Sequence, residues 1–541
     1  MPVANRIKPF HGNISFHAHH SPMGAYMSFT CGKFYTRGGF GLEMGRPGNQ
    51  EIFVGVKRGR REEDVPLRCL PFFEGAESHD SARFLVEGAA AGVAVGRRIE
   101  SYPAGRIRRR YGWASDSWST PDFTFSIFTP FGPISPTDPP LPAILAELTI
   151  DNRRGRSTVT GVFAVRFPDG GLRLLDGPGR GFAWRDRLGV SVELWQWGRS
   201  NRKSAEGRMI NDQLLQFLRW DPAEALLDAN PVHLLGNTAG FGFEVPAGLK
   251  RVLVLALGCY VEGVVTTGFR GRYAYTRCQS SLEQVLQEQL RRAASDRRRA
   301  AQLDATLERA RLNRDQKFLI AHATRSYYGN TQLLEVGGEP FWIVNEGEYC
   351  MMNTLDLSVD QVFWELDQNP WVVQNLLDRF VRHYSFVDQI KIPRPGARSA
   401  ARHQAQFGPE SEAQPRVLGA PQPMELFELR EGGISFCHDM GAHNQFSPPG
   451  SSSYELPDIV GCFSHMTSEQ LCNWSLMAAC YVHHTTDDDW LRRNHHIIAA
   501  CLQSLLNRGG RAGFCQYDSA RCRTGAEITS YDSLDHSLAQ A

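Results

Sequence analysis

The sequence predicts a multidomain protein of β and α parts, in which an N-terminal β-sandwich is followed by a toroid of paired helices. The chain has 541 residues, which is more than one domain usually contains. Apolar residues alternate in short runs up to about residue 280 and recur at helical spacing further on. A long charged stretch without Gly or Pro separates the two regions.

Residues 1–280 are predicted to form the β-sandwich. Runs with apolar residues at every second position, such as QEIFVGVKRG, DFTFSIFTPFG and STVTGVFAVRF, are broken by Gly, Pro, Asp and Asn. Further strands are expected in VSVELWQW and RVLVLALGCYVEG, with turns at PDGG, DGPGRG and PAG. Many short strands separated by turns are typical of two packed antiparallel sheets.

Residues 281–312 are predicted to form a helical linker. The stretch LEQVLQEQLRRAASDRRRAAQLDATLERARL is rich in Leu, Ala, Glu, Gln and Arg, all of which favour a helix. Its apolar residues recur at helical spacing, so one face should lie on a domain surface.

Residues 313–541 are predicted to form the helical domain. Amphipathic helices are expected in RDQKFLIAHATRSYY, SVDQVFWELDQN, WVVQNLLDRFVRHYS, TSEQLCNWSLMAACYVHHT and DDWLRRNHHIIAACLQSLLNRG. The SVDQ and TSEQ sequences offer Ser or Thr caps followed by acidic first turns. The stretch from about 394 to 431 is rich in Pro, Gly, Gln and Ala and is expected to be an exposed insertion.

Composition excludes several classes of function. The net charge of +1 gives no global field that would attract nucleic acid or an anionic membrane. The first twenty residues lack the apolar segment of a signal peptide, and no run of eighteen apolar residues could span a membrane. The 12 cysteines show no CxxC pair, as expected for reduced thiols. We therefore expect a cytoplasmic protein with no nucleic-acid or membrane partner.

Carboxylates follow a buried run in FWIVNEGEYCMMNTLD, residues 341–356. Ionised groups are costly to desolvate, so Glu346 and Glu348 need a reason to stand there. Asn345 could orient a carboxylate, and Gly347 leaves room for a ligand to approach the backbone. The alternative is an ordinary loop whose acidic groups cap a helix or pair with Arg.

Two further stretches carry similar groups beside apolar ones. SYDSLDHSL holds Asp532 and Asp535, and ISFCHDMG holds His438 and Asp439. Two carboxylates from separate elements, with His, amide and hydroxyl groups around them, are the constellation used in glycoside hydrolysis.

Other kinds of site remain open. FHAHH would place His17 and His19 on one face of a strand, where they could bind a metal. Alternatively, His19 or His20 could contact a sugar or form structural hydrogen bonds. Cys437 beside His438 suggests a thiolate nucleophile, but neighbours in a strand point to opposite faces. We predict neither a metal site nor a cofactor.

The chain resembles glycoside hydrolase family 52, the β-xylosidases. The stretches that match occur in order along nearly the whole chain: AHHSPMGAYMSFT, LPFFEG, RSYYGNTQLLE, VNEGEYCMMNT, ISFCHDMG, SSYELPDIVGCFSHMT and GAEITSYDSLDHSL. The resemblance implies an N-terminal β-sandwich packed on a catalytic (α/α)6 barrel.

The resemblance also implies roles for single residues. Glu346 corresponds to the nucleophile of a retaining enzyme, and Asp532 corresponds to its general acid/base. A related family of β-glucosidases in the same clan suggests Asp356, His438 and Ser530 as ligands for the sugar hydroxyls. Asp439, His19, His20 and Asn345 are further expected substrate-binding residues.

The chain departs from the family pattern at several points. Cys350 stands where Arg is usual, and Ser530 stands where Thr is usual. The insertion around 394–431 is not part of the pattern. The chain ends at Ala541, where family members continue, so the barrel is expected to be incomplete and the chain poorly active or inactive.

The expected function is that of a xylan 1,4-β-xylosidase that removes terminal β-1,4-linked D-xylose from xylobiose and short xylo-oligosaccharides by double displacement. One alternative is the β-glucosidase-like activity of the same clan. Another is a truncated carbohydrate-binding protein without catalysis, which a test of turnover on an aryl xyloside would identify. A homodimer is the family expectation.

Overall fold

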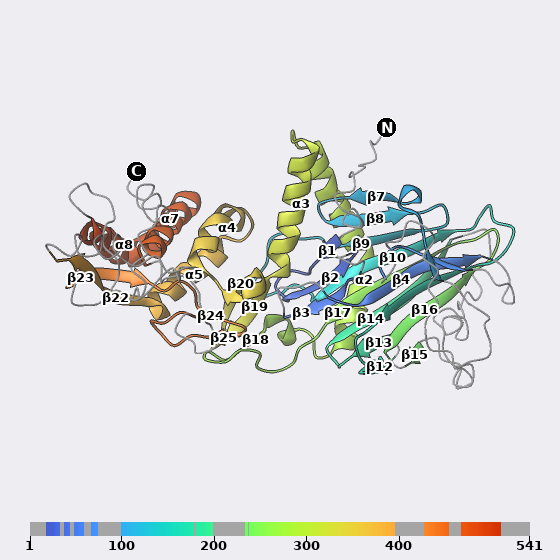
Figure 1. Ribbon diagram of the computed structural model, residues 1–541, viewed down its shortest axis with the longest axis horizontal. Coiled ribbons are helices and arrows are strands. Elements are labelled where there is room, and N and C mark those ends of the chain that lie inside the picture. The colour runs from blue at the N-terminus through green and yellow to red at the C-terminus, as the bar shows by residue number, and fades with distance from the viewer. Residues whose placement is uncertain are drawn as a thin grey trace, which may run out of the picture. The chain divides into compact units, whose positions relative to one another are not determined.

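The computed structural model describes residues 18–32, 37–43, 48–58, 66–73, 99–177, 180–197, 233–235, 237–394, 427–453 and 467–509 (Figure 1). Contacts divide the chain into two compact units, Met1–Gly263 with Tyr273–Leu333, and Val264–Arg272 with Leu334–Ala541. The domain boundaries expected at residues 280 and 312 stay a prediction, because a unit defined by contacts need not fold by itself.

The first unit contains three sheets. An eight-stranded sheet has the order β12-β13-β14-β17-β10-β9-β8-β7, a six-stranded sheet has the order β15-β16-β11-β4-β5-β6, and a third has the order β1-β2-β3. The strands are β1 (Ala18–His20), β2 (Met27–Cys31), β3 (Gly39–Leu42), β4 (Glu51–Arg58), β5 (Leu67–Cys69), β6 (Ile99–Ser101), β7 (Arg108–Tyr111), β8 (Ser115–Ser119), β9 (Thr124–Phe128), β10 (Ala143–Asp151), β11 (Val159–Arg166), β12 (Leu172–Leu174), β13 (Gly181–Trp184), β14 (Leu188–Trp197), β15 (His233–Leu235), β16 (Thr238–Val245) and β17 (Lys250–Cys259).

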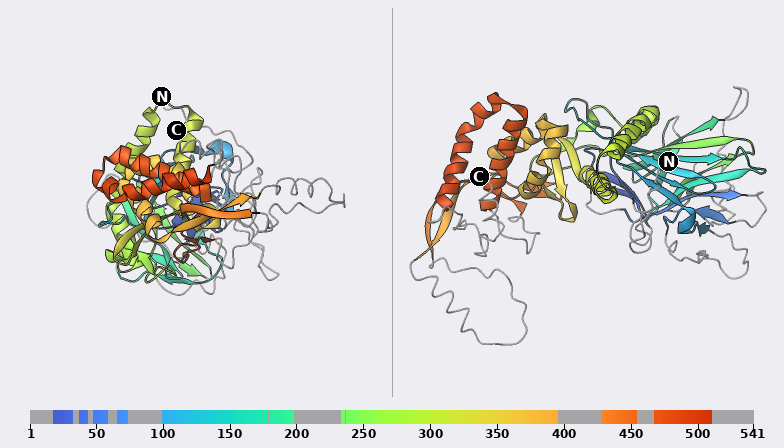
Figure 2. Two further views of the ribbon diagram at one scale, coloured as in Figure 1. Left: turned by 90° about the vertical axis from the view of Figure 1, so that its left-hand side faces the viewer. Right: turned by 90° about the horizontal axis from the view of Figure 1, so that it is seen from above.

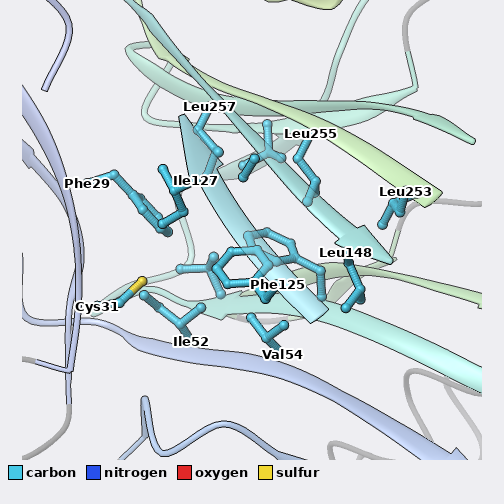
Figure 3. Packing of buried hydrophobic residues seen from close by; sticks show 14 of the residues in the cluster. Phe29, Cys31, Ile52, Val54, Phe125, Ile127, Leu148, Leu253, Leu255 and Leu257 are labelled. Carbon is cyan, nitrogen blue, oxygen red and sulfur yellow. The ribbon is translucent and has the colours of Figure 1, made fainter. Parts of the chain in front are cut away.

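The two larger sheets share one hydrophobic core. Phe125 and Leu255 of the eight-stranded sheet belong to the same buried cluster as Ile52 and Val54 of the six-stranded sheet (Figure 3). All four side chains are fully buried. The two sheets therefore pack face to face, which is the arrangement of the predicted β-sandwich.

Strand β17 shows why some segments read as continuous apolar runs. Leu253 and Leu255 point into the core between the sheets, whereas Val252 and Val254 belong to a cluster with Ala293 of helix α2 (Leu282–Arg309). Both faces of the strand are covered, so apolar residues are needed at every position.

The long helix predicted from residue 282 is confirmed as α2. Ser281 caps it by accepting a hydrogen bond from the Gln284 amide, and its buried side chains lie against β17, β14 and β10. Helix α3 (Arg314–Gly329) follows, with a capping box between Asn313 and Gln316.

A second six-stranded sheet has the order β18-β19-β20-β21-β24-β25. Its strands are β18 (Gly271–Tyr273), β19 (Thr331–Val336), β20 (Glu339–Glu346), β21 (Met351–Met352), β24 (Gly441–Ala442) and β25 (Gln445–Phe446). The second unit also contains α4 (Leu355–Gln368), α5 (Pro370–His383), the hairpin of β22 (Ser385–Pro393) and β23 (Phe427–Phe436), α7 (Thr467–Thr485) and α8 (Asp488–Arg508). Figure 2 shows α7 and α8 beside this hairpin.

One prediction for the second unit needs correction. Ser358 does not cap α4, since the helix begins at Leu355 and the buried Ser358 hydroxyl donates to the carbonyl of Thr354. The exposed insertion expected at about 394–431 stays a prediction; β23 begins near its end, at Phe427, and pairs with β22. The predicted helices are confirmed, whereas closure of an (α/α)6 barrel stays a prediction.

A buried ion pair connects the hairpin to α8. The guanidinium of Arg508 lies 2.5 Å from the carboxylate of Asp388, at a bulge in β22, and also donates to the Gly432 carbonyl at 2.8 Å. We expect Arg508→Met to lower the free energy of unfolding by roughly 3–5 kcal/mol, because it leaves a buried carboxylate without its cation.

Urea unfolding measures this loss. The double variant Asp388→Leu with Arg508→Met should recover most of it, because an apolar pair of similar volume has no charge to desolvate. A double variant that loses more stability than Arg508→Met would contradict this account.

The described helices include none that is both long enough and apolar enough to cross a membrane.

Candidate active site

Glu346 lies at the end of β20, where the buried run of that strand gives way to a tight turn. Gly347 to Tyr349 form one 3-10 turn, and the amide of Cys350 donates to the Glu346 carbonyl at 3.0 Å. Strand β21 then returns along β20, so that Glu346 pairs with Met351. The turn thus holds Glu346 at the edge of a buried hairpin.

Two residues near this turn have left-handed backbone conformations. Cys350 has a φ of 53° and is only 7% exposed, so this buried residue carries backbone strain. Gly347 has a φ of 39°, and a Cβ atom there would meet nothing within 4 Å. Glycine is therefore needed at residue 347 for its conformation and not for its packing.

Asn353 fixes β20 from the returning chain. Its side-chain oxygen accepts from the Val344 amide at 2.7 Å, and its amide group donates to the Trp342 carbonyl at 3.1 Å. Its φ is 53°, a conformation that Asn tolerates better than most residues. The sequence-based prediction missed this residue, although an Asn between two buried segments was an available signal.

The second six-stranded sheet brings the loop that contains His438 next to the turn that contains Glu346. This loop connects β23 to β24, and β24 pairs with β21 through Ala442 and Met351. The Met440 amide donates to the Met352 carbonyl at 2.9 Å, and the Leu355 amide donates to the His438 carbonyl at 3.0 Å. Backbone hydrogen bonds therefore hold two segments together that lie about ninety residues apart in sequence.

Asp439 is fully buried, and hydrogen-bond donors surround its carboxylate. Oδ1 accepts from the amides of Gly441 and Ser453, both at 2.8 Å. Oδ2 accepts from the Ser453 hydroxyl at 2.7 Å and lies 2.8 Å from Nδ1 of His438. Ser453 was not predicted as part of the site, because no local pattern shows that its hydroxyl meets Asp439.

His438 has a carboxylate at each ring nitrogen. Nδ1 contacts Asp439, and Nε2 lies 3.7 Å from Oδ1 of Asp356, which is in the first turn of α4. Burial alone would lower the pKa of His438, but Asp356 and Asp439 outweigh burial and raise that pKa to about 10. The ring is therefore an imidazolium at neutral pH.

The same charges act on the other carboxylates. Burial raises the pKa of Glu346, His438 opposes that rise, and Asp356 and Asp439 add to it. For Asp356, burial raises the pKa, but His438 and the backbone amides of Asp356 and Leu357 together lower it by more. Three carboxylates against one imidazolium leave the site negatively charged, which suits a cationic transition state.

The charge of His438 should make stability depend on pH. The pKa of about 10 in the folded chain lies above the ordinary value of 6.5, so this stabilisation is complete below pH 6.5 and is lost as the pH rises through 10. The difference in free energy of unfolding between the wild type and His438→Gln should shrink over this range. At 1.36 kcal/mol per pKa unit, the change is at most about 5 kcal/mol.

Urea titrations at several pH values measure this difference, and taking the difference cancels groups that titrate equally in both proteins. A constant difference from pH 6 to pH 10 would mean that folding does not raise the pKa of His438.

The other predicted site residues lie in different places. Asn345 is 3% exposed and points away from the face that carries Glu346, because neighbours in a strand alternate. Asp532 and Ser530 lie outside the described residues. Asp356, His438 and Asp439 are thus the predicted residues whose charges act directly on Glu346.

His19 and His20 lie on β1 in the first unit. The ring nitrogens of His20 contact the Thr129 hydroxyl at 2.8 Å and Asp116 at 3.1 Å, and the side chain is fully buried. Burial, reinforced by the nearby Arg325, lowers the pKa of His20 to about 4. These contacts favour structural hydrogen bonding over sugar contact. Nε2 of the partly buried His19 lies 3.0 Å from the Ser21 hydroxyl.

Other kinds of site gain no support from the described residues. No group of three or more His, Cys, Asp or Glu residues among them could hold a metal ion. Cys437 is 4% exposed, so its thiol is poorly placed to attack a ligand.

The chain is similar to known proteins over most of its length. The family model described as glycosyl hydrolase family 52 matches residues 29–407 and 417–481. A β-xylosidase from Geobacillus stearothermophilus is 37% identical in an alignment 551 residues long. The alignment covers 98% of this chain and 71% of that protein. A second β-xylosidase from the same organism is also 37% identical over 551 residues, with 97% and 81% covered.

Proposed function

The chain belongs to glycosyl hydrolase family 52, and on this basis we propose that it is a retaining β-xylosidase. The proposed substrates are xylobiose and short xylo-oligosaccharides, from which it releases the terminal β-1,4-linked D-xylose. Both relatives are named as β-xylosidases, which supports this choice of sugar. A catalytic (α/α)6 barrel and a homodimer belong to the same proposal.

The observation that carries the proposal is the environment of Glu346. Its carboxylate is half-buried at the end of β20. The charges of His438, Asp356 and Asp439 act on its pKa. A nucleophile for glycoside hydrolysis needs an ionised carboxylate that faces developing positive charge at the anomeric carbon. The negative site lowers the energy of that transition state relative to the neutral substrate.

The proposed reaction has two displacements. Asp532 donates its proton to the glycosidic oxygen while Glu346 attacks the anomeric carbon, and the bond to the leaving sugar breaks. Asp532, now ionised, then takes a proton from water, which attacks the same carbon and releases Glu346. In retaining enzymes the two carboxyl groups lie about 5–5.5 Å apart.

The proposal also assigns the binding of sugar hydroxyls. Asp356 can accept hydrogen bonds from hydroxyls, whereas an imidazolium at His438 can only donate. Ser530 remains a candidate for a further contact, whereas Asn345 points away from the face that carries Glu346 and the ring nitrogens of His20 contact Thr129 and Asp116.

The test is turnover by the purified full chain. The kcat/KM for 4-nitrophenyl β-D-xyloside should exceed that for the corresponding β-D-glucoside, which carries an additional hydroxymethyl group. Proton NMR during hydrolysis of 4-nitrophenyl β-D-xyloside, whose leaving group is not a sugar, should show β-xylose as the first product. Preference for the glucoside would overturn the choice of sugar, and α-xylose as the first product would overturn retention.

A further inference from the structure

We propose that Asp439 is a positioning residue that contacts no substrate and instead holds His438 as an imidazolium beside Glu346. This role differs from the substrate contact expected for Asp439 from the sequence. The inference rests on the proposed function of Glu346 as the nucleophile.

The hydrogen bonds of Asp439 leave no capacity for a ligand. A carboxylate offers about four lone-pair directions. Two backbone amides, of Gly441 and Ser453, occupy Oδ1, and the Ser453 hydroxyl and the His438 ring occupy Oδ2. The side chain has no exposed surface, so a sugar hydroxyl could reach it only by displacing one of these donors.

The same contacts determine the protonation of His438. A neutral imidazole donates from one ring nitrogen and accepts at the other. Here the neighbour of each nitrogen is a carboxylate, Asp439 at Nδ1 and Asp356 at Nε2, and an ionised carboxylate can only accept. Nδ1 is within hydrogen-bond distance of Asp439 and Nε2 is at an ion-pair distance of 3.7 Å from Asp356, so the doubly protonated ring suits both neighbours best, and the raised pKa of His438 agrees with this.

The imidazolium then acts on Glu346, which must be ionised to attack. Burial, Asp356 and Asp439 favour the protonated form of Glu346, and among the described charges that act on it His438 alone opposes them. Glu348, Tyr349, Cys350 and His443 are the further titratable residues of the turns around Glu346. Asp439 thus disfavours the ionised form of Glu346 through its own charge. It also favours that form, because it holds His438 as a cation beside Glu346.

The decisive variant is Asp439→Asn. The amide oxygen can still accept from the two backbone amides, but the NH2 group then faces Nδ1 of His438 and requires an acceptor there. The His438 ring should lose its charge, which raises the pKa of Glu346. The acid limb of the profile of kcat/KM against pH should therefore shift to higher pH by on the order of one unit. If Asp439 were merely structural, activity would fall by the same factor at every pH and the limb would stay in place.

Two matched variants control for loss of structure. Asp388→Asn removes another fully buried carboxylate of the same unit, the partner of Arg508, and should reduce stability without moving the acid limb. Ser453→Ala removes one donor to Asp439 but keeps the carboxylate. A shift of the limb in Asp388→Asn as large as in Asp439→Asn would overturn the proposal.

A second measurement does not depend on turnover. In the full chain labelled with carbon-13 at histidine Cε1, the His438 signal is the one that disappears in His438→Gln. It should remain that of an imidazolium from pH 5 to pH 8 in the wild type. A neutral ring at pH 7 would overturn the inference even if Asp439→Asn did not fold. If the wild type does not hydrolyse an aryl xyloside, the proposed function is wrong. The NMR signal of His438 between pH 5 and pH 8 still shows whether its ring is protonated.

Discussion

Replacing Glu346 by glycine is expected to reduce hydrolysis of aryl β-xylosides by roughly 10⁴- to 10⁶-fold, the loss seen when a hydrolase loses a catalytic side chain that forms or activates its nucleophile. The variant should stay folded, because the carboxylate is only half-buried at the end of β20 and its removal leaves little apolar surface without a partner. The measurement is kcat on 4-nitrophenyl β-D-xyloside, together with the unfolding midpoint.

The matched control is Glu339→Gln at the other end of the same strand. Its carboxylate is 58% exposed and pairs with Arg379 at 2.9 Å. This variant removes one carboxylate from β20 without approaching the proposed reaction centre, so its kcat should stay within a few-fold of the wild type. A loss as large as that of Glu346→Gly would mean that the strand, and not the nucleophile, is responsible.

Stereochemistry provides a sharper test of Glu346. With the side chain gone, azide can enter the vacated face and attack the anomeric carbon, which should yield α-xylosyl azide through a single inversion. A 2-fluoroxyloside inactivator should label Glu346 in the wild type, because the fluorine slows the second displacement. A label on Glu348 would contradict the assignment.

Most of the fold could be predicted because local patterns determine it. The alternation in β9, the apolar run of β17 and the absence of Gly and Pro from α2 are properties of short windows, and the structure agrees with all three. The cap of α4 was predicted wrongly, because SVDQ is a good local cap whereas tertiary packing buries Ser358 inside the helix. The hairpin of β22 and β23 was missed, because its strands are separated by more than thirty residues.

The sequence points to residues of the candidate site but not to the contacts between them. Glu346, His438 and Asp439 stand out because charged groups follow apolar runs. That Asp439 is enclosed by Ser453 and that His438 lies between two carboxylates depends on pairing among β20, β21 and β24. Pairing over such distances follows from the whole core, and no short window of sequence contains it.

Replacing Asp532 by alanine should affect substrates in proportion to their need for a proton. We expect hydrolysis of xylobiose to fall by on the order of 10³-fold, because a sugar alkoxide leaves poorly unless a general acid protonates it. An activated aryl xyloside should lose far less in its first displacement, since a nitrophenolate leaves without help. The motivation is the YDSLD match to the general acid/base of the family.

Azide separates this role from that of Glu346. In Asp532→Ala the glycosyl-enzyme on Glu346 still forms, so azide should attack it in a second inversion and yield β-xylosyl azide, the anomer opposite to that from Glu346→Gly. Asp535→Ala, which removes the other carboxylate of the same motif, is the matched control and should show neither azide product nor dependence on the leaving group. Equal losses of Asp532→Ala on xylobiose and on the aryl xyloside would contradict the role of general acid, because protonation of the leaving group would then not be the step that the variant loses.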